Sequence, residues 1–148
     1  MITIERANLA HKEVLNDLMQ RQFDEHEICI RCEILDSAIQ EVLARSELGF
    51  ILIAKEFEQI VGFAAISFAW TLEYGGKSAW LDELYVLPKH RKKGTGGLLV
   101  DKVVEEAQRE ECRAIDLEVE EKHRRAERLY ENKGFKRLMR SRWTRPLI

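Results

Sequence analysis

Long hydrophobic runs are missing from this sequence of 148 residues. The longest nearly apolar stretch, residues 60–70, has 11 residues and is interrupted by Gly62 and Ser67. A membrane-spanning helix needs about 20 apolar residues, so we expect no membrane segment. Residues 1–6 also lack a basic stretch followed by a long apolar one, and no secretory signal is predicted. These two absences favour a soluble protein in the cytoplasm.

Proline and cysteine are also scarce, with two and three residues. No Pro- or Gly-rich linker, repeat or biased segment divides the chain, so we expect a single domain over residues 1–148. Cys29, Cys32 and Cys112 are odd in number and cannot all pair. The CxxC formed by Cys29 and Cys32 has no second pair or histidine cluster beside it, which favours packing over zinc or redox chemistry. The sequence therefore predicts reduced thiols and no metal.

Charge is balanced overall but not along the chain. With 45% hydrophobic and 34% charged residues, intrinsic disorder is excluded, and a chain of this length buries roughly 68–70% of its unfolded surface. The net charge of −2 divides into −7 for residues 1–74 and +5 for residues 75–148. A basic second half suits an anionic ligand and an acidic first half suits a cationic one, although solvated surface charge explains the pattern equally well.

Hydropathy patterns predict a mixed α/β domain with the element order βααβββαβαβ. Apolar residues at helical spacing predict helices over residues 9–26, 32–45, 94–111 and 122–133. Alternating or β-branched stretches predict strands over residues 2–4, 50–57, 60–70, 78–87, 114–119 and 135–145. The tight connection at residues 58–59 predicts an antiparallel hairpin, and residues 71–77 are expected to form a loop.

One segment joins a strand to a basic, glycine-rich turn. A strand ending at Leu87 is followed by four consecutive basic or imidazole residues, His90–Lys93. Three glycines, Gly94, Gly96 and Gly97, then open a helix. The first amides of a helix have no internal partner and the dipole there is positive, while glycine lets a phosphate approach the backbone. This combination predicts a diphosphate-binding turn.

Two other phosphate-binding motifs do not fit this turn. A Walker A loop requires Lys-Ser/Thr after its last glycine, and no such pair follows here. A dinucleotide-binding fingerprint would place its third glycine at position 99, which is Leu99. Neither a P-loop nor a Rossmann domain is therefore expected.

Two motifs carry a resemblance to a known family. Arg91-Lys92-Lys93-Gly94-Thr95-Gly96 resembles the [RQ]-x-x-G-x-[GA] acyl-CoA signature of the GNAT family of N-acetyltransferases. Residues 117–119 and 126–135 resemble the family's L-x-V and A-x-x-L-Y-x-x-x-G-F segments. Residues 72–76, which lead into residues 82–86, are similar to bacterial members of undefined substrate. Because the element order also agrees, the resemblance spans essentially the whole chain.

The resemblance implies a GNAT fold, with a mixed, mostly antiparallel sheet splayed between its fourth and fifth strands, and acetyl-CoA as cosubstrate. The diphosphate is expected on the turn formed by Arg91, Lys92, Lys93, Gly94, Thr95, Gly96 and Gly97. The pantetheine arm is expected beside the backbone of Leu84, Tyr85 and Val86, where an N–H polarises the thioester carbonyl. Further cofactor contacts are implied for Ala126, Tyr130 and His123. The family often has Asn at position 123, so ligand contact and solvent exposure stay equally open for His123.

The resemblance also implies direct attack of an amine on the thioester. A lysine-like amine has a pKa near 10.4, so a base or a water chain must take its proton at pH 7. Asp82 and Glu83 are the local candidates, and strand geometry sends them to opposite faces. Glu83 is favoured, a β-bulge would reverse that choice, and an ion pair is the structural alternative for either. Tyr130 occupies the family's general-acid position for the departing thiolate, and packing against Ala126 is its other interpretation.

Acidic residues indicate which charge the acceptor carries. In the family the first two helices usually line the acceptor pocket, and here they include Asp24 and Glu25. With Glu73 and Asp82, they predict a cationic acceptor such as a polyamine, an amino sugar or a protein amine. The basic residues 136–145 suggest nucleic acid less strongly, because at strand spacing they form a solvated edge.

The sequence therefore predicts an acetyl-CoA-dependent N-acetyltransferase that acts on a small-molecule or peptide amine. The competing class is a non-catalytic acyl-CoA-binding module that uses the same turn for regulation, and a nucleic-acid-binding domain is the third. Many family members form homodimers, and the predicted final strand is an edge with which another copy could pair.

Overall fold

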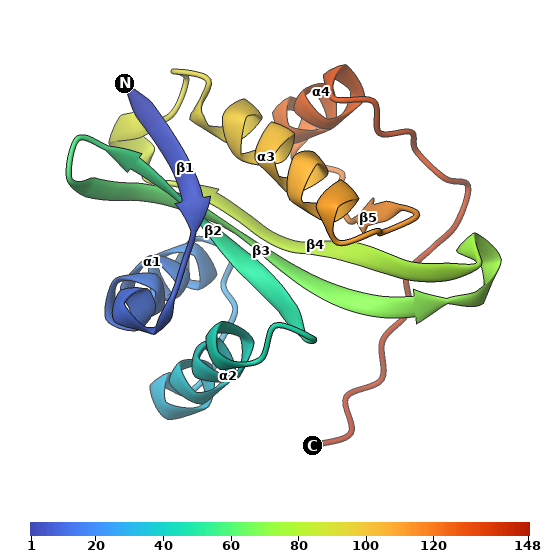
Figure 1. Ribbon diagram of the computed structural model, residues 1–148, viewed down its shortest axis with the longest axis horizontal. Coiled ribbons are helices and arrows are strands. Elements are labelled where there is room, and N and C mark those ends of the chain that lie inside the picture. Colours follow the sequence, from blue (N-terminus) through green and yellow to red (C-terminus); the bar gives the residue numbers. More distant parts are fainter. The chain divides into compact units, whose positions relative to one another are not determined.

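The computed structural model describes all residues, 1–148, and separates into two compact units, Met1–Glu118 and Val119–Ile148. The first unit contains one five-stranded sheet, with α1 and α2 on one face and α3 on the other (Figure 1). None of the helices has the length and apolar character needed to cross a bilayer. The single domain over residues 1–148 stays a prediction.

Short-range patterns account for most of the element bounds. The first unit consists of β1 (Ile2–Arg6), α1 (Lys12–Glu25), α2 (Cys32–Ala44), β2 (Gly49–Glu56), β3 (Gln59–Thr71), β4 (Gly76–Val86), α3 (Thr95–Arg109) and β5 (Ile115–Leu117). Three short 3-10 helices, η1 (Leu9–His11), η2 (Leu72–Tyr74) and η3 (Pro88–His90), join them, and the second unit contains α4 (Arg124–Asn132). The predicted helices and the hairpin of β2 and β3 are therefore confirmed to within a few residues.

The sheet has the order β1-β2-β3-β4-β5, antiparallel except for the parallel pair β4 and β5. β5 pairs with β4 only from Ala79 to Leu81. β4 continues to Val86, so β5 leaves the edge of β4 open over residues 82–86. An edge that opens part-way along the strand is what a sheet splayed between its fourth and fifth strands requires.

A β-bulge interrupts β4 at Asp82. Glu83 pairs with Ala65 of β3, but the next pair in the register is Leu81 with Ile66, so Asp82 has no partner of its own. The extra residue shifts the alternation of side chains along the strand. Tyr85 accordingly belongs to the core cluster under α1 and α2, whereas Leu81 is buried outside that cluster.

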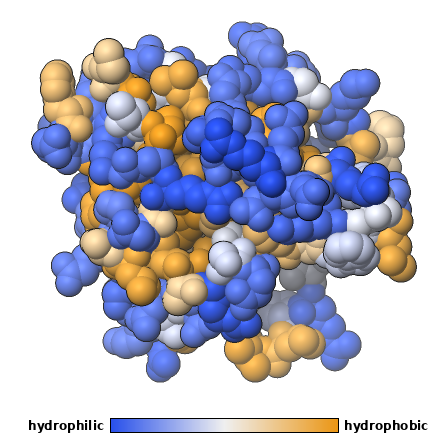
Figure 2. Space-filling view, in the orientation of Figure 1, coloured by the Kyte–Doolittle hydropathy of each residue, from blue (hydrophilic) through white to orange (hydrophobic).

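Apolar side chains fill both faces of the sheet. Beneath α1 and α2 the core is formed by Leu15, Leu18, Met19, Phe23, Leu35, Ile39, Ile51, Ile53, Phe63 and Tyr85. On the opposite face α3 buries Leu99, Val100 and Val103 completely. Each fully buried aliphatic side chain contributes about 1.5–3 kcal/mol to folding. Hydrophilic and hydrophobic residues are intermixed on the surface in Figure 2.

The predicted final strand is wrong. Residues 135–148 form neither strand nor helix, and the side chains of Leu138, Met139 and Trp143 are exposed. Arginines at four positions interrupt this segment, and alternation alone does not supply backbone N–H and C=O partners. Because this edge is not a strand, the reason for expecting pairing between copies through it is lost, and the homodimer stays a prediction.

Two smaller expectations also differ from the structure. The strand expected over residues 114–119 is only three residues long, from Ile115 to Leu117. The loop expected over residues 71–77 contains η2 and the beginning of β4, since Gly75 turns the chain with a φ of 75°. Both differences arise where the pairing of strands, rather than local composition, decides where an element begins or ends.

Candidate active site

The glycine turn lies between the end of β4 and the beginning of α3. Gly94 precedes α3 with a φ of 85°, a left-handed conformation that favours glycine. A Cβ at Gly94 would meet no atom within 4 Å, so the backbone conformation, and not space, requires glycine there. Leu98 N–H donates to Gly94 O over 3.1 Å, and the amides of the helical residues before Leu98 form the positive end of α3.

Thr95 begins α3 but faces the protein interior. Its side chain is only 2% exposed, and its Oγ1 atom has no hydrogen-bond partner. An anion on the turn would therefore meet the Thr95 amide and not its hydroxyl. The exposed side chains of the turn are those of Arg91, Lys92 and Lys93.

Arg91 is held by groups of the protein itself. Its Nε donates to Val86 O over 2.7 Å, and one of its terminal nitrogens contacts both carboxylate oxygens of Glu25, at 3.1 and 2.9 Å. Tyr85 also donates its hydroxyl to Glu25 over 2.9 Å. Burial alone would raise the pKa of Glu25, but the hydrogen bonds from Arg91 and Tyr85 hold it below its ordinary value. Arg91 therefore ties the end of α1 to the turn.

A second carboxylate, Glu56 at the end of β2, pairs with the same turn. His90 Nδ1 lies 2.5 Å from one oxygen of Glu56, and Lys93 Nζ lies 3.8 Å from the other. The hydrogen bond with His90 is the main cause that lowers the pKa of Glu56. Glu25 and Glu56 together neutralise much of the positive charge that the sequence places at the turn.

Glu83 is the titratable group whose pKa departs most from its ordinary value. It is partly buried and accepts a hydrogen bond from Gln22 Nε2 over 2.7 Å. Burial, followed by the charge of Asp82, raises the pKa of Glu83 to about 7, although the bond from Gln22 lowers it. The β-bulge that would reverse the choice between the two carboxylates is present, but Asp82, the bulge residue, is exposed, whereas Glu83 faces Gln22 of α1, so Glu83 stays the candidate base. A carboxyl group that titrates near neutral pH has the property expected of a general base.

Leu84, Tyr85 and Val86 lie on the stretch of β4 that β5 leaves open. Tyr85 is buried against Phe63, with ring centroids 6.1 Å apart in an edge-on arrangement. The carbonyl of Val86 already accepts from Arg91, so its oxygen has one bond within the protein. The structure thus places all three predicted pantetheine contacts next to the turn on one edge.

The residues predicted to bind the acceptor do not all come together. Asp24 and Glu25 lie at the end of α1, whereas Glu73 lies in η2, before β4 begins. The length of β4 separates η2 from the turn, roughly 30 Å at 3.3 Å per residue. A shallow cavity of about 230 Å³ also lies at that distant end, lined by Glu47, Phe68, Ala69, Trp70 and Lys77.

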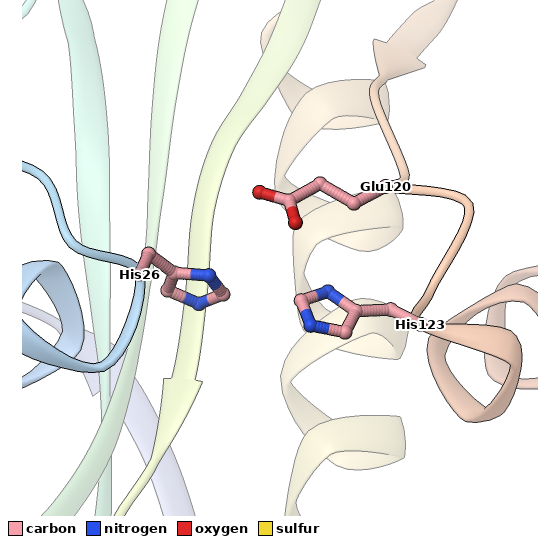
Figure 3. Close-up of side chains that lie close together, drawn as sticks. All are labelled: His26, Glu120 and His123. Carbon is pink, nitrogen blue, oxygen red and sulfur yellow. The ribbon is translucent and has the colours of Figure 1, made fainter.

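In the second unit, the predicted residues lie on or beside α4. His123 precedes α4, and its backbone N–H donates to the carbonyl oxygen of Glu120 over 2.9 Å. Figure 3 draws the side chains of His123 and Glu120 together with that of His26, the residue after α1 in the first unit. Ala126 and Tyr130 are in α4, and the Tyr130 ring packs edge-on against Phe135 at 5.8 Å. Gly134 ends the helix with a φ of 91°, as its place in the sequence predicts.

The glycine turn, the open edge of β4 and the segment around α4 all fall within one family match. The sequence model of the acetyltransferase (GNAT) family matches residues 12–135. This chain belongs to the GNAT family. Its mixed five-stranded sheet is the GNAT fold that the sequence predicts.

Relatives of this GNAT protein include the uncharacterized N-acetyltransferase YhfO of Bacillus subtilis (strain 168), which is 31% identical over 85 residues. That match covers 57% of each chain, so this chain spans little more than half the length of the curated relative. A predicted acetyltransferase of Clostridium acetobutylicum with acetyl-CoA has a TM-score of 0.82 at 22% identity, covering 98% and 96% of the two chains. The aminoglycoside N-acetyltransferase AAC(6')-Iy with CoA has a TM-score of 0.84 at 18% identity, covering 100% and 96%.

Two residues that contact the predicted site of this GNAT domain are missed by the sequence patterns. Gln22 lies at the helical spacing of the apolar residues of α1, and its polarity at such a position is the signal that it has a polar partner. Glu56 ends a hydrophobic strand, and nothing nearby in the sequence connects it to His90, 34 residues later.

Proposed function

We propose that this enzyme transfers the acetyl group of acetyl-CoA to a primary amine in one step, without a covalent acyl-enzyme. One observation carries the proposal: the edge of β4 that β5 leaves open includes Glu83 and leads directly to the glycine turn. A thioester arm along this edge would bring its acetyl group to a carboxyl group whose pKa is about 7. The family membership supports the same reaction.

The cosubstrate would bind through charge and backbone. Its diphosphate would accept hydrogen bonds from the amides at the beginning of α3, with the exposed Lys92 nearby. Its pantetheine amides would pair with β4 between Asp82 and Val86, as an added strand does. A backbone N–H of that segment would polarise the thioester carbonyl and stabilise the developing oxyanion.

Glu83 would act as the base. An amine with a pKa near 10.4 enters as an ammonium ion and gives one proton to Glu83. The neutral nitrogen attacks the carbonyl carbon, the new C–N bond forms, and the C–S bond breaks. The nitrogen loses its second proton as the departing thiolate gains one, so the reaction releases one proton overall. Tyr130 is our candidate donor to the thiolate, on the strength of the sequence resemblance.

A cationic acceptor is the second part of the proposal. Asp82 is exposed beside Glu83, and Asp24 is exposed at the end of α1. Glu25 is already engaged by Arg91, so it supports this part of the proposal less than the sequence predicts. Glu73 is too far along β4 to join these residues and is left out of the proposed acceptor site.

The test is an acetyl-CoA consumption screen with polyamines, aminoglycosides, amino acids and peptide N-termini, read by thiol release. We expect turnover with at least one cationic amine and slower turnover with neutral amines at low salt. Calorimetric binding of acetyl-CoA without transfer to any amine would favour the non-catalytic module instead. No binding heat would refute both.

Replacement of Glu83 tests its role directly. We expect Glu83→Gln to reduce kcat about 10²–10⁴-fold, the usual contribution of a general base, while the Kd of acetyl-CoA stays unchanged. The comparison variant is Asp82→Asn, which keeps the proposed base but removes a charge from the proposed acceptor site, so its main effect should be on the KM of a cationic amine and not on kcat. Equal losses in both variants would contradict the assignment to Glu83.

A further inference from the structure

Gln22 is a polar residue in an apolar layer. It lies in α1 with the core residues Leu18, Met19 and Phe23 and is 5% exposed. Its Nε2 donates to Glu83 Oε2 over 2.7 Å, but its Oε1 is buried without any partner. A buried amide oxygen without a hydrogen bond destabilises the fold, and such groups are rare in proteins.

Packing does not explain a glutamine at this position. A methionine has nearly the same length and shape and would fill the same space without an unsatisfied oxygen. The fold therefore retains a destabilising atom together with one specific bond to Glu83. Residues that break a local rule in this way are expected where function depends on them.

We propose that Gln22 is the positioning residue for the base Glu83, an inference that rests on the proposed function. Its N–H occupies Oε2, so Oε1 is the carboxylate oxygen left to receive the proton of the amine. The bond can persist when Oε1 is protonated, because Oε2 then remains a carbonyl-type acceptor. Gln22 thus keeps Glu83 in one orientation through both protonation states.

The charged groups near Glu83 do not account for the positioning of its carboxylate that we assign to Gln22. On β4 itself, Asp82 opposes the charged form of Glu83. From β3 the paired residue is Ala65, and from α1 the contact is the neutral Gln22. Tyr85, two residues along β4, bonds instead to Glu25, which is paired with Arg91. The bond from Gln22 is the one contact that lowers the pKa of Glu83.

The experiment compares Gln22→Met with the matched control Gln20→Met, on the same helix but bonded to Cys32 and not to Glu83. The Glu83 carboxyl carbon is followed by ¹³C NMR from pH 4 to 9, and kcat/KM is measured over the same range. We expect Gln22→Met to move the Glu83 midpoint and the acidic limb of the rate profile upward by about one pH unit. The control should move neither.

Stability separates this role from a structural one. At pH 6 we expect Gln22→Met to unfold at about the same temperature as the wild type, because removal of the unsatisfied Oε1 offsets the loss of the bond to Glu83 Oε2. Gln22→Glu is the second variant, and its extra carboxyl group should raise the Glu83 midpoint further.

Three outcomes decide the proposal. An unchanged Glu83 midpoint in both variants would overturn it, and so would a shifted midpoint with an unshifted rate profile. If no amine is acetylated at all, the proposed function fails, and with it any role of Gln22 in that reaction. The NMR titration would then still show whether Gln22 controls the protonation of Glu83.

Discussion

At the scale of single residues, Glu83 links stability to pH. Its pKa is about 7 in the folded protein against 4.5 for the ordinary group, so the folded state binds more protons between these values. Stability must then fall as pH rises from about 4.5 to about 7 and level off above that range. We expect Glu83→Gln to remove this component, which urea unfolding of both proteins at pH 4, 5, 6, 7 and 8 would measure. A wild-type minus variant difference that is constant with pH would contradict the raised pKa.

Tyr130 has a catalytic and a packing interpretation, which one substitution separates. Phenylalanine keeps the edge-on contact with Phe135 but removes the hydroxyl. If the phenol protonates the thiolate, we expect Tyr130→Phe to lower kcat about 10²-fold with little change in thermal stability. Steady-state rates from pH 6 to 9 are the measurement. An unchanged kcat throughout would leave packing as its role.

The type of a residue does not reveal its ion-pair partner when that partner is distant in the sequence. The sequence assigns Arg91 to the cofactor and Glu25 to the acceptor, yet the two side chains pair with each other. Their positions are 66 residues apart, so no local pattern reveals the contact. The charge of each residue could be predicted from the sequence, but the partner that satisfies that charge could not.

At the scale of elements, the turn before α3 offers a matched pair of glycines. Gly94 and Gly75 both have left-handed φ values, 85° and 75°, and both have open space where a Cβ would stand. We expect Gly94→Ala and Gly75→Ala each to cost about 1 kcal/mol of stability. Only Gly94→Ala should also weaken acetyl-CoA binding in calorimetry. Equal affinities in the two variants would place the diphosphate elsewhere.

Element prediction succeeds where periodicity is local and fails where pairing is decisive. The helical spacing of Leu99, Val103 and Ala107 predicts α3, and these side chains are buried as expected. Residues 135–145 contain apolar residues between arginines, but the structure has no strand there. A helix satisfies its backbone internally, whereas a strand needs a neighbour that its own sequence does not specify.

At the scale of the whole molecule, ligand binding should increase the stability of the folded protein. Acetyl-CoA that binds only the folded state at 100 times its Kd adds about 2.7 kcal/mol, which for a chain of this size raises Tm by roughly 5–10 °C. Differential scanning calorimetry with acetyl-CoA, and with adenosine as a control without diphosphate, would measure this. We expect no shift with adenosine, and equal shifts would show that the turn does not select the diphosphate.

The sequence by itself determines the glycine turn, the family motifs and most helices of this protein, because each depends on neighbours within a few residues. Only the tertiary structure decides how the carboxylates are used. The bulge at Asp82, the bond from Gln22 to Glu83 and the pairing of Arg91 with Glu25 depend on strand register and on side chains more than 60 residues apart. Register is set by which faces are buried together, and burial is a property of the assembled fold.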